Sequence, residues 1–272
     1  MSRLPITSGC GGCGAGVDLG FDFTMALQPI VNMSTRQVIA QEALVRGLQG
    51  EGAPHILGQV TDENRYAFDQ RCRVKAVQLG AKLGVQSLLS INFMPNAVYE
   101  PERCIRTTLE AAAACNFPVE RILFEFTEGE RITDIKHVRS IIAHYRARGF
   151  RTAIDDFGAG YAGLNLLAEL QTDYLKLDME LVRSIDRSYA RQAIVKGILS
   201  VCRDLGIAPI AEGVETIEEL RALMDLGIEL FQGYLLARPA FEAQAEVHLP
   251  LQSVLDARPR RDSSGLGQPR LQ

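Results

Sequence analysis

The chain has 272 residues, of which 47% are hydrophobic and 23% are charged, and this composition is typical of a globular protein with one large core. The formal net charge of -4 argues against sequence-independent binding to DNA or RNA, because such binding depends on clustered Lys and Arg that neutralise phosphates. No apolar stretch is long enough to span a bilayer and no signal-peptide pattern is visible, so we expect a cytoplasmic protein without a membrane span.

Residues 1–20 are expected to form a flexible N-terminal segment, because they are rich in glycine. The segment contains a C-x-x-C pattern, Cys10-Gly-Gly-Cys13. This spacing occurs in zinc sites and in redox pairs, but a zinc site needs two more ligands and a redox pair normally opens a helix. Neither feature is visible nearby, so a mobile tail is favoured over a metal or redox role.

After this segment, short apolar runs alternate with longer helical patterns. The runs predicted as strands are residues 24–31, 38–44, 87–93, 122–126, 151–155, 174–177, 208–212 and 230–236. The segments predicted as helices are residues 61–83, 101–115, 131–148, 180–205 and 216–226. Eight strands with intervening helices predict an α/β fold, a TIM-like (β/α)8 barrel.

One connection departs from this repeat. Only residues 32–37 separate the first two strands, which is far too short for a crossover helix, so the first strand is expected to run antiparallel to the second. The barrel is expected to occupy residues 21–250. Residues 251–272, which contain Pro, Ser, Gly and Arg, are expected to be a disordered C-terminal tail.

Polar side chains recur near the carboxyl ends of the predicted strands. They are Glu42, Asn92, Glu125, Asp155, Asp156, Lys176, Glu212 and Gln232. In an α/β barrel these strand ends converge on the face where active sites are assembled. Any one of these carboxylates is more commonly a solvated loop residue, but five of them with an Asn and a Lys at one barrel mouth are hard to explain as an accident.

The two-residue period of a strand places Lys176 inside the predicted barrel, because the leucines on either side of it share the helix-covered face. The same rule points Glu125 inward, since phenylalanines flank it. Carboxylates gathered there would repel one another and lose hydration unless cations were present. Hard divalent ions with oxygen ligands are the simplest remedy, and paired ions are a common device for cleaving phosphodiesters.

These residues lie in a series of short motifs. In chain order the motifs are Gln41-Glu42-Ala43-Leu44-Val45-Arg46, Asn92-Phe93, Glu125-Phe126-Thr127-Glu128, Asp155-Asp156-Phe157-Gly158-Ala159-Gly160-Tyr161, Lys176-Leu177-Asp178, Glu212-Gly213-Val214-Glu215-Thr216 and Gln232-Gly233-Tyr234-Leu235. Together they resemble the EAL domain family of cyclic di-GMP phosphodiesterases, over about residues 21–250. Residues 64–70 are similar to the variant found in blue-light-sensing EAL proteins. The family barrel has an antiparallel first strand, in agreement with the short connection at 32–37.

The resemblance implies a site for two Mg2+ or Mn2+ ions and hydrolysis of cyclic di-GMP to linear pGpG. The implied metal ligands are Glu42, Asn92, Glu125 and Asp155 for one ion, and Asp155, Asp156 and Glu212 for the other. The implied catalytic residues are Lys176 and Gln232, which would orient the attacking water, together with Glu212 and Glu128. The implied substrate contacts are Gln28, Leu44, Arg46, Asn92 and Asp178.

Glu128 lies three residues after Glu125 and thus beyond the predicted strand end. By resemblance it anchors the glycine-rich loop at residues 158–163 rather than binding the same ion. The resemblance further implies a homodimer formed through residues 164–170 and part of 180–205. An upstream sensory or signalling partner is also expected.

Two alternatives stay open. A catalytically silent EAL domain would act as a cyclic di-GMP receptor or a protein-interaction module, and such relatives usually lack several metal ligands, all of which are present here. An unrelated barrel lyase would use Lys176 as a Schiff base, but neighbouring carboxylates raise the pKa of a lysine and work against that chemistry.

Overall fold

The structure is a computed structural model, and it describes residues 18–95, 98, 100–127, 134–160 and 163–251. Cys10, Cys13 and Glu128 lie outside these residues, as does the tail from residue 252 onwards, so the predictions made for them stay predictions. None of the helices within the described ranges is long and apolar enough to cross a lipid bilayer.

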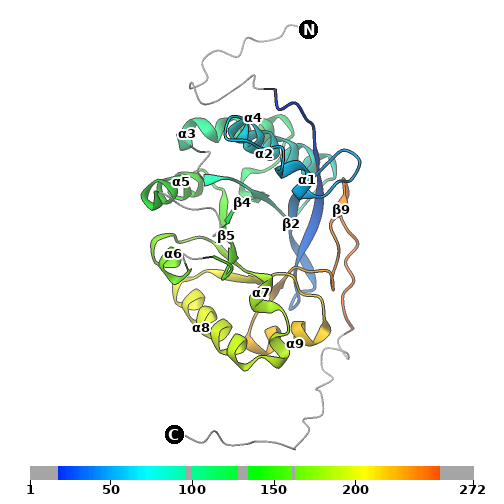
Figure 1. The fold of residues 1–272 in the computed structure, drawn as a ribbon, viewed down its shortest axis with the longest axis vertical. Coiled ribbons are helices and arrows are strands. Elements are labelled where there is room, and N and C mark those ends of the chain that lie inside the picture. Colours follow the sequence, from blue (N-terminus) through cyan, green and yellow to red (C-terminus); the bar gives the residue numbers. More distant parts are fainter. Residues whose placement is uncertain (1–17, 96–97, 99, 128–133, 161–162, 252–272) are drawn as a thin grey trace, which may run out of the picture.

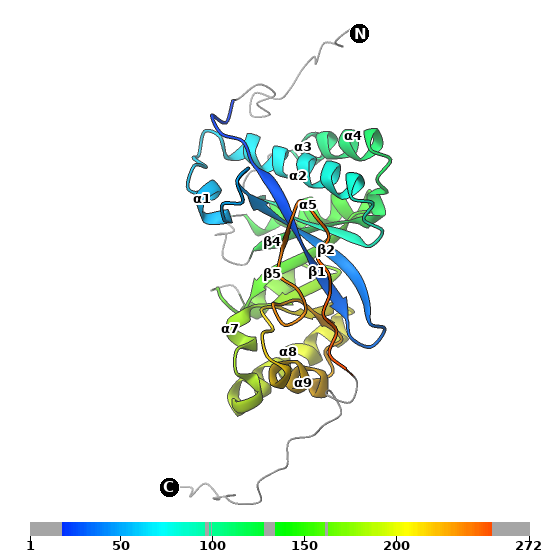
Figure 2. The same ribbon diagram turned by 90° about the vertical axis from the view of Figure 1, so that its right-hand side faces the viewer.

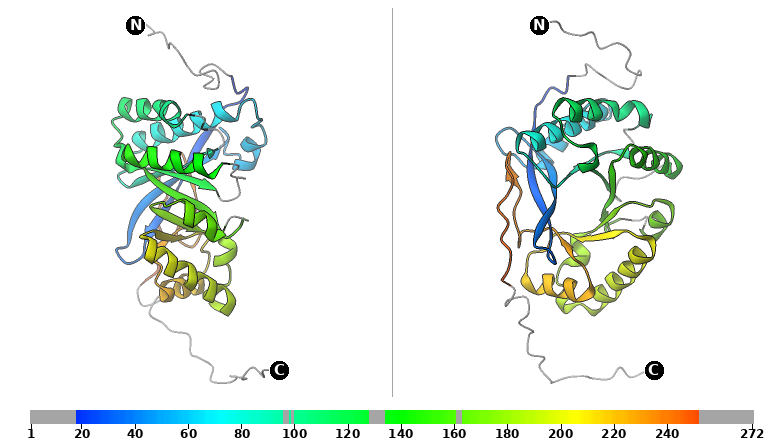
Figure 3. Two further views of the ribbon diagram at one scale, coloured as in Figure 1. Left: turned by 90° about the vertical axis from the view of Figure 1, so that its left-hand side faces the viewer. Right: turned by 180° about the vertical axis from the view of Figure 1, so that it is seen from behind.

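The strands form a closed mixed barrel with the helices on its outside (Figure 1 and Figure 3). The strands are β1 Thr24–Asn32, β2 Gln37–Arg46, β3 Leu88–Asn92, β4 Ile122–Thr127, β5 Arg151–Phe157, β6 Tyr174–Leu177, β7 Ala208–Ala211, β8 Leu230–Phe231 and β9 Ala240–Phe241. Strands β2 to β8 pair in parallel and in chain order. Strand β1 closes the barrel by pairing antiparallel with both β2 and β8. The predicted TIM-like barrel with an antiparallel first strand is therefore confirmed.

The hairpin of β1 and β2 is the longest pair in the barrel, and the short strand β9 lies along its outer side (Figure 2). Its turn spans the residues between Asn32 and Gln37, where Asn32 Oδ1 accepts a hydrogen bond from Thr35 N. A turn of this length joins antiparallel neighbours without a crossover. Strand β8 has only two residues, so the predicted strand at 230–236 is too long and Gln232 comes directly after its end.

The helices fill most of the connections between the parallel strands. They are α1 Ala53–Leu57, α2 Arg65–Lys82, α3 Pro101–Cys104, α4 Arg106–Ala114, α5 Ile135–Ala147, α6 Gly163–Glu169, α7 Met179–Val182, α8 Tyr189–Leu205 and α9 Ile217–Leu226, with 3-10 turns at Val119–Arg121 and Ile185–Arg187. Helix α9 begins with a capping box, in which Thr216 and Glu219 each accept a hydrogen bond from the other's backbone N–H. The predicted helix at 180–205 is interrupted, because Ser184 adopts a left-handed φ of 53° between α7 and the next turn.

Inside the barrel, a small apolar cluster forms a floor beneath the polar residues. Ile30, Ala40, Ile210 and Leu230 pack together at the end where the parallel strands begin. Side chains two residues further along a strand point to the same face. The inward positions that follow Ala40 and Ile210 are therefore Glu42 and Glu212. The apolar cluster thus lies directly beneath the polar residues at the carboxyl ends of the parallel strands, the polar mouth of the barrel.

Candidate active site

Lys176 lies at the centre of the polar mouth and is 1% exposed. Its Nζ lies 2.7 Å from Glu125 Oε2, 2.8 Å from Glu212 Oε1, 3.0 Å from Asp155 Oδ1 and 3.2 Å from Glu42 Oε2. Burial alone lowers the pKa of a lysine, but these four carboxylates outweigh it and raise the pKa of Lys176 well above its ordinary value. Lys176 is therefore a fixed positive charge that holds four acidic side chains in place.

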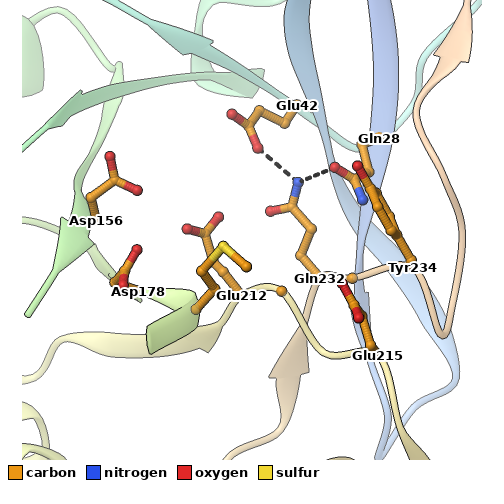
Figure 4. Close-up of a pocket in the computed structure, with 11 residues that line it drawn as sticks. Gln28, Glu42, Asp156, Asp178, Glu212, Glu215, Gln232 and Tyr234 are labelled. Atoms are coloured by element: carbon orange, nitrogen blue, oxygen red, sulfur yellow. Dashed lines mark hydrogen bonds between the residues drawn. The ribbon is translucent and has the colours of Figure 1, made fainter. Parts of the chain in front are cut away.

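Glu42, on β2, is held by two amides as well as by Lys176, and Figure 4 shows the hydrogen bond from one of these amides, that of Gln232. Asn92 Nδ2 donates to Glu42 Oε1 at 2.9 Å, and Gln232 Nε2 donates to Glu42 Oε2 at 2.7 Å. Gln232 Nε2 also lies 3.2 Å from Gln28 Oε1 on β1. Burial opposes ionisation of Glu42, yet Lys176 and these hydrogen bonds hold the pKa of Glu42 below its usual value. Glu42 is thus a buried carboxylate that stays charged.

The carboxylates form two groups that share one member. Oxygen atoms of Glu42, Glu125 and Asp155 all lie within 4.8 Å of one another, and so do those of Asp155, Asp156 and Glu212. Each group is close enough for its members to bind one ion together. Asp155 belongs to both groups, and a carboxylate shared in this way can help to hold two divalent ions side by side.

A bulge in β5 brings Asp155 and Asp156 to the same place. The pairing of β5 with β6 passes from Ile154 opposite Leu175 to Phe157 opposite Leu177, so Asp155 and Asp156 both lie opposite Lys176. In a regular strand these neighbours would point to opposite faces. A bulge with a left-handed residue re-aims a side chain, and Asp156 has a φ of 53°. Sequence periodicity does not reveal this bulge.

The site carries more negative than positive charge. Burial, reinforced by Glu42 and Asp155 and opposed by Lys176, raises the pKa of Glu125 to about 8. Burial and the charge of Asp155 raise the pKa of Asp156 to about 6. Burial also raises the pKa of Glu212 well above its usual range, although Lys176 opposes the shift. At these three carboxylates, burial and mutual repulsion therefore outweigh the single positive charge of Lys176.

The donor set fits hard divalent cations. Glu125 Oε1 is buried and has no hydrogen-bond partner among the described residues, and the same is true of Gln232 Oε1. A buried oxygen without a partner costs free energy that a cation ligand would recover. Carboxylate and amide oxygens are the ligands that Mg2+ and Mn2+ prefer.

A pocket of about 240 Å3 opens beside these carboxylates. Its walls include the predicted site residues Gln28, Glu42, Asp156, Asp178, Glu212 and Gln232. Met179, Glu215 and Tyr234 also line it, although no pattern in the sequence predicts a role for them. Tyr234 and Glu215 lie within quoted motifs, but only the folded loops show that their side chains face the pocket (Figure 4).

Three predicted substrate contacts, Leu44, Arg46 and Asn92, are not among the residues that line this pocket. Leu44 and Arg46 are half-buried at the end of β2. Arg46 Nη1 donates to the Val45 carbonyl oxygen at 2.7 Å. Asp178, by contrast, lines the pocket and caps α7 by accepting a hydrogen bond from Glu180 N at 2.8 Å.

Gly233 allows the loops after β7 and β8 to pack backbone against backbone. Val214 N donates to Gln232 O, and Leu235 N donates to Val214 O, each at 3.1 Å. A Cβ at Gly233 would lie 2.7 Å from the carbonyl carbon of Val214 and would overlap its nitrogen and oxygen. Rigid backbone cannot move aside as a flexible side chain can.

We therefore expect Gly233→Ala to lower stability by about 1–3 kcal/mol through overpacking and to displace Gln232 from Glu42. Chemical denaturation measures the first effect, and a crystal structure of the variant measures the second as a longer distance between Gln232 Nε2 and Glu42 Oε2. Gly197→Ala is the matched control, because a Cβ at Gly197 on α8 would meet nothing within 4 Å. Equal behaviour of the two variants would contradict this account of the loops.

The family model described as "EAL domain" matches residues 19–239, which is most of the chain. The chain belongs to the EAL domain family. The matched region contains the whole polar mouth of the barrel, from Gln28 on β1 to Gln232 after β8.

Curated relatives and solved structures of EAL proteins agree with this placement. The chain is 35% identical over 214 residues to the blue light- and temperature-regulated antirepressor BluF of Escherichia coli, covering 78% of this chain and 53% of the relative. It is 33% identical over 163 residues to the cyclic di-GMP phosphodiesterase PdeB of Shewanella oneidensis, covering 60% of this chain and 19% of the relative. It thus spans about half or less of these curated relatives.

The similar solved structures include complexes with cyclic di-GMP. A standalone versatile EAL protein from Vibrio cholerae, solved with bound c-di-GMP, is 55% identical with a TM-score of 0.83, covering 85% of this chain and 98% of that one. The manganese and cyclic di-GMP complex of Klebsiella pneumoniae BlrP1 is 38% identical with a TM-score of 0.77, covering 81% of this chain and 56% of that one.

Proposed function

We propose that this EAL domain hydrolyses cyclic di-GMP to linear pGpG with the help of two Mg2+ or Mn2+ ions. The observation that carries the proposal is the pair of carboxylate groups that share Asp155 around Lys176. A relative named as a cyclic di-GMP phosphodiesterase, and similar structures holding cyclic di-GMP with manganese, support the choice of substrate and metal.

The residues present divide into two ligand sets. Glu42, Glu125 and Asp155, with the amide of Asn92, would hold one ion, and Asp155, Asp156 and Glu212 would hold the other. Two bound divalent ions neutralise the charge on the attacking and leaving oxygens of an in-line phosphodiester displacement. The protein residues supply the geometry, because Lys176 fixes four of these carboxylates before substrate arrives.

In this proposal, Lys176 and Gln232 orient the attacking water. The four neighbouring carboxylates raise the pKa of Lys176 and favour its protonated form, in which Nζ can donate a hydrogen bond to the water. Gln232 is anchored through Nε2 to Glu42, while its Oε1 has no hydrogen-bond partner among the described residues and can accept one from a water. The pocket beside them, with Gln28 and Asp178 in its walls, would hold the substrate.

The raised pKa of Lys176 argues against the lyase alternative, since Schiff-base formation needs a neutral amine. The alternative of a silent receptor domain is less consistent with the site, because the carboxylates of both ligand sets are present and close together. The homodimer, the sensory partner, the cytoplasmic location, the role of Glu128 in anchoring the loop at 158–163 and the contacts of Arg46 and Leu44 with substrate stay parts of this proposal.

The test is incubation of the full chain with cyclic di-GMP and either Mg2+ or Mn2+, followed by chromatography of the products. We expect linear pGpG to form with the metal and not in excess EDTA, because the carboxylates alone cannot stabilise an anionic phosphate. Binding of cyclic di-GMP without any pGpG would refute the enzyme and support the receptor. Equal turnover with and without EDTA would refute the metal dependence.

A further inference from the structure

Helix α7 packs between the two loops that carry Asp156 and Glu212. On one side the Leu181 side chain rests on the backbone after β5, so that a Cβ added to Gly158 would overlap Leu181 Cδ1 and lie 3.1 Å from Cγ. On the other side a Cβ added to Gly213 would lie 2.5 Å from Met179 Cβ. Both loops therefore touch this four-residue helix directly, at glycines.

Backbone hydrogen bonds join the start of α7 to the same two loops. Asp178 N donates to Phe157 O at 3.1 Å, and Glu212 N donates to Leu177 O at 3.2 Å. The segment from Leu177 to Leu181 thus bridges the β5 bulge and the end of β7. It therefore contacts the backbone next to both Asp156 and Glu212.

Asp156 needs such support because its backbone is strained. Its φ of 53° is in the left-handed region, which a residue with a Cβ adopts only at a cost in free energy. Strained residues persist where the surrounding structure holds them. Asp156 N donates to Asp155 Oδ1 at 3.0 Å, and Ala159 N donates to Asp156 O at 3.1 Å, but these are local bonds that move with the loop. Contacts from α7 hold the loop from outside.

We propose that Leu181 is a positioning residue that holds the β5 bulge in the conformation in which Asp156 lies beside Asp155 and Glu212. The proposal rests on the metal binding assigned above to these three carboxylates. Leu181 is half-buried, and its side chain has no polar atom that could bind a metal or substrate. It acts through the packing of its branched end on Gly158.

The ion held by Glu42, Glu125 and Asp155 should not depend on Leu181 in the same way. Glu42 and Glu125 come from regular positions on β2 and β4, away from the bulge, and are tied to Lys176. Asp155 lies on the bulge, but it keeps its regular place opposite Thr127 of β4 and its ion pair with Lys176. Removing the Leu181 side chain should therefore weaken the binding of one of the two ions and leave the binding of the other unchanged. General destabilisation would affect both ions alike.

The experiment measures Mn2+ binding to the full chain by electron paramagnetic resonance, without substrate, for the wild type, Leu181→Ala and Leu181→Met. We expect Leu181→Ala to lower the affinity for one ion by about 10–100-fold and to leave the affinity for the other unchanged. This is the usual effect of losing a group that orients a metal ligand. In turnover assays its kcat should recover at high Mn2+. Leu181→Met, which conserves volume, should behave as the wild type does.

Leu109→Ala is the matched control, because Leu109 is also half-buried against the core but lies on α4, which packs against α2. Leu181→Val, which removes the δ carbons that reach Gly158, gives the same comparison if the alanine variant does not fold.

The proposal would be overturned if Leu181→Ala bound two ions with wild-type affinity. It would also be overturned if Leu109→Ala lost as much affinity, or if the wild type bound fewer than two ions. A wild type that binds two ions but leaves cyclic di-GMP intact would refute the proposed function, and the comparison of Mn2+ binding would still decide the role of Leu181.

Discussion

Asp155→Asn is expected to lower kcat for cyclic di-GMP by about 1,000-fold or more. The substitution removes a carboxylate ligand from both metal sites at once, and the ions that would stabilise the reacting phosphate bind less tightly. Asp155 is the one residue that belongs to both carboxylate groups. The replacement keeps the size of the side chain, and the asparagine oxygen can still accept the hydrogen bond from Asp156 N. The fold should therefore survive while binding of both ions weakens.

Kinetics and Mn2+ binding measured on the same preparation check this prediction. Asp225→Asn is the matched control, since Asp225 is exposed on α9 and belongs to neither carboxylate group. Glu42→Gln should cost less than Asp155→Asn, because Glu42 belongs to only one group. Near-normal turnover by Asp155→Asn would mean that the shared carboxylate is not a metal bridge.

Lys176→Met is expected to have the largest effect on the protein without metal. Lys176 pairs with four carboxylates, and three of them are at least nine-tenths buried. Removing one partner of a buried ion pair typically costs about 3–5 kcal/mol, because the remaining charge is left without compensation. Methionine fills a similar volume, so the loss should be electrostatic rather than a packing defect.

The same variant should recover part of its stability when Mn2+ is added, since the ion supplies the missing positive charge and binds the folded state. Denaturation in EDTA and in Mn2+ measures this difference. The rate of cyclic di-GMP hydrolysis should stay at least about 100-fold below that of the wild type even with Mn2+, because Lys176 no longer orients the water. Lys82→Met, at an exposed position on α2, is the control. An unchanged free energy of unfolding for Lys176→Met in EDTA would contradict the electrostatic role assigned to Lys176.

Much of the barrel could be predicted because its signals are local. The connection at 32–37 is too short for a helix, and this alone predicts the antiparallel β1, which the structure confirms. Alternation of polar and apolar residues predicts that Lys176 and Glu125 point inward, and both are buried there. These inferences need only the geometry of one strand.

Other features depend on contacts between distant segments. The length of β8 is set by the strands it pairs with, and its pairing with β1 and β7 ends at Phe231, whereas the predicted strand continues to Leu236. The predicted helix at 180–205 breaks at Ser184, whose backbone N–H donates to Glu219 Oε1 on α9 at 2.9 Å. No pattern within that segment reveals a partner 35 residues away.

The sequence by itself thus determines which carboxylates face into the barrel, because the alternation of polar and apolar residues and the length of a connection can be read from a few neighbouring residues. Their division into two groups is a property of the folded barrel. It depends on the bulge that places Asp155 and Asp156 together opposite Lys176, and on the packing of α7 against Gly158 and Gly213. A bulge is chosen by the register between two strands and by what packs on them, and neither can be read from residues 151–157 alone.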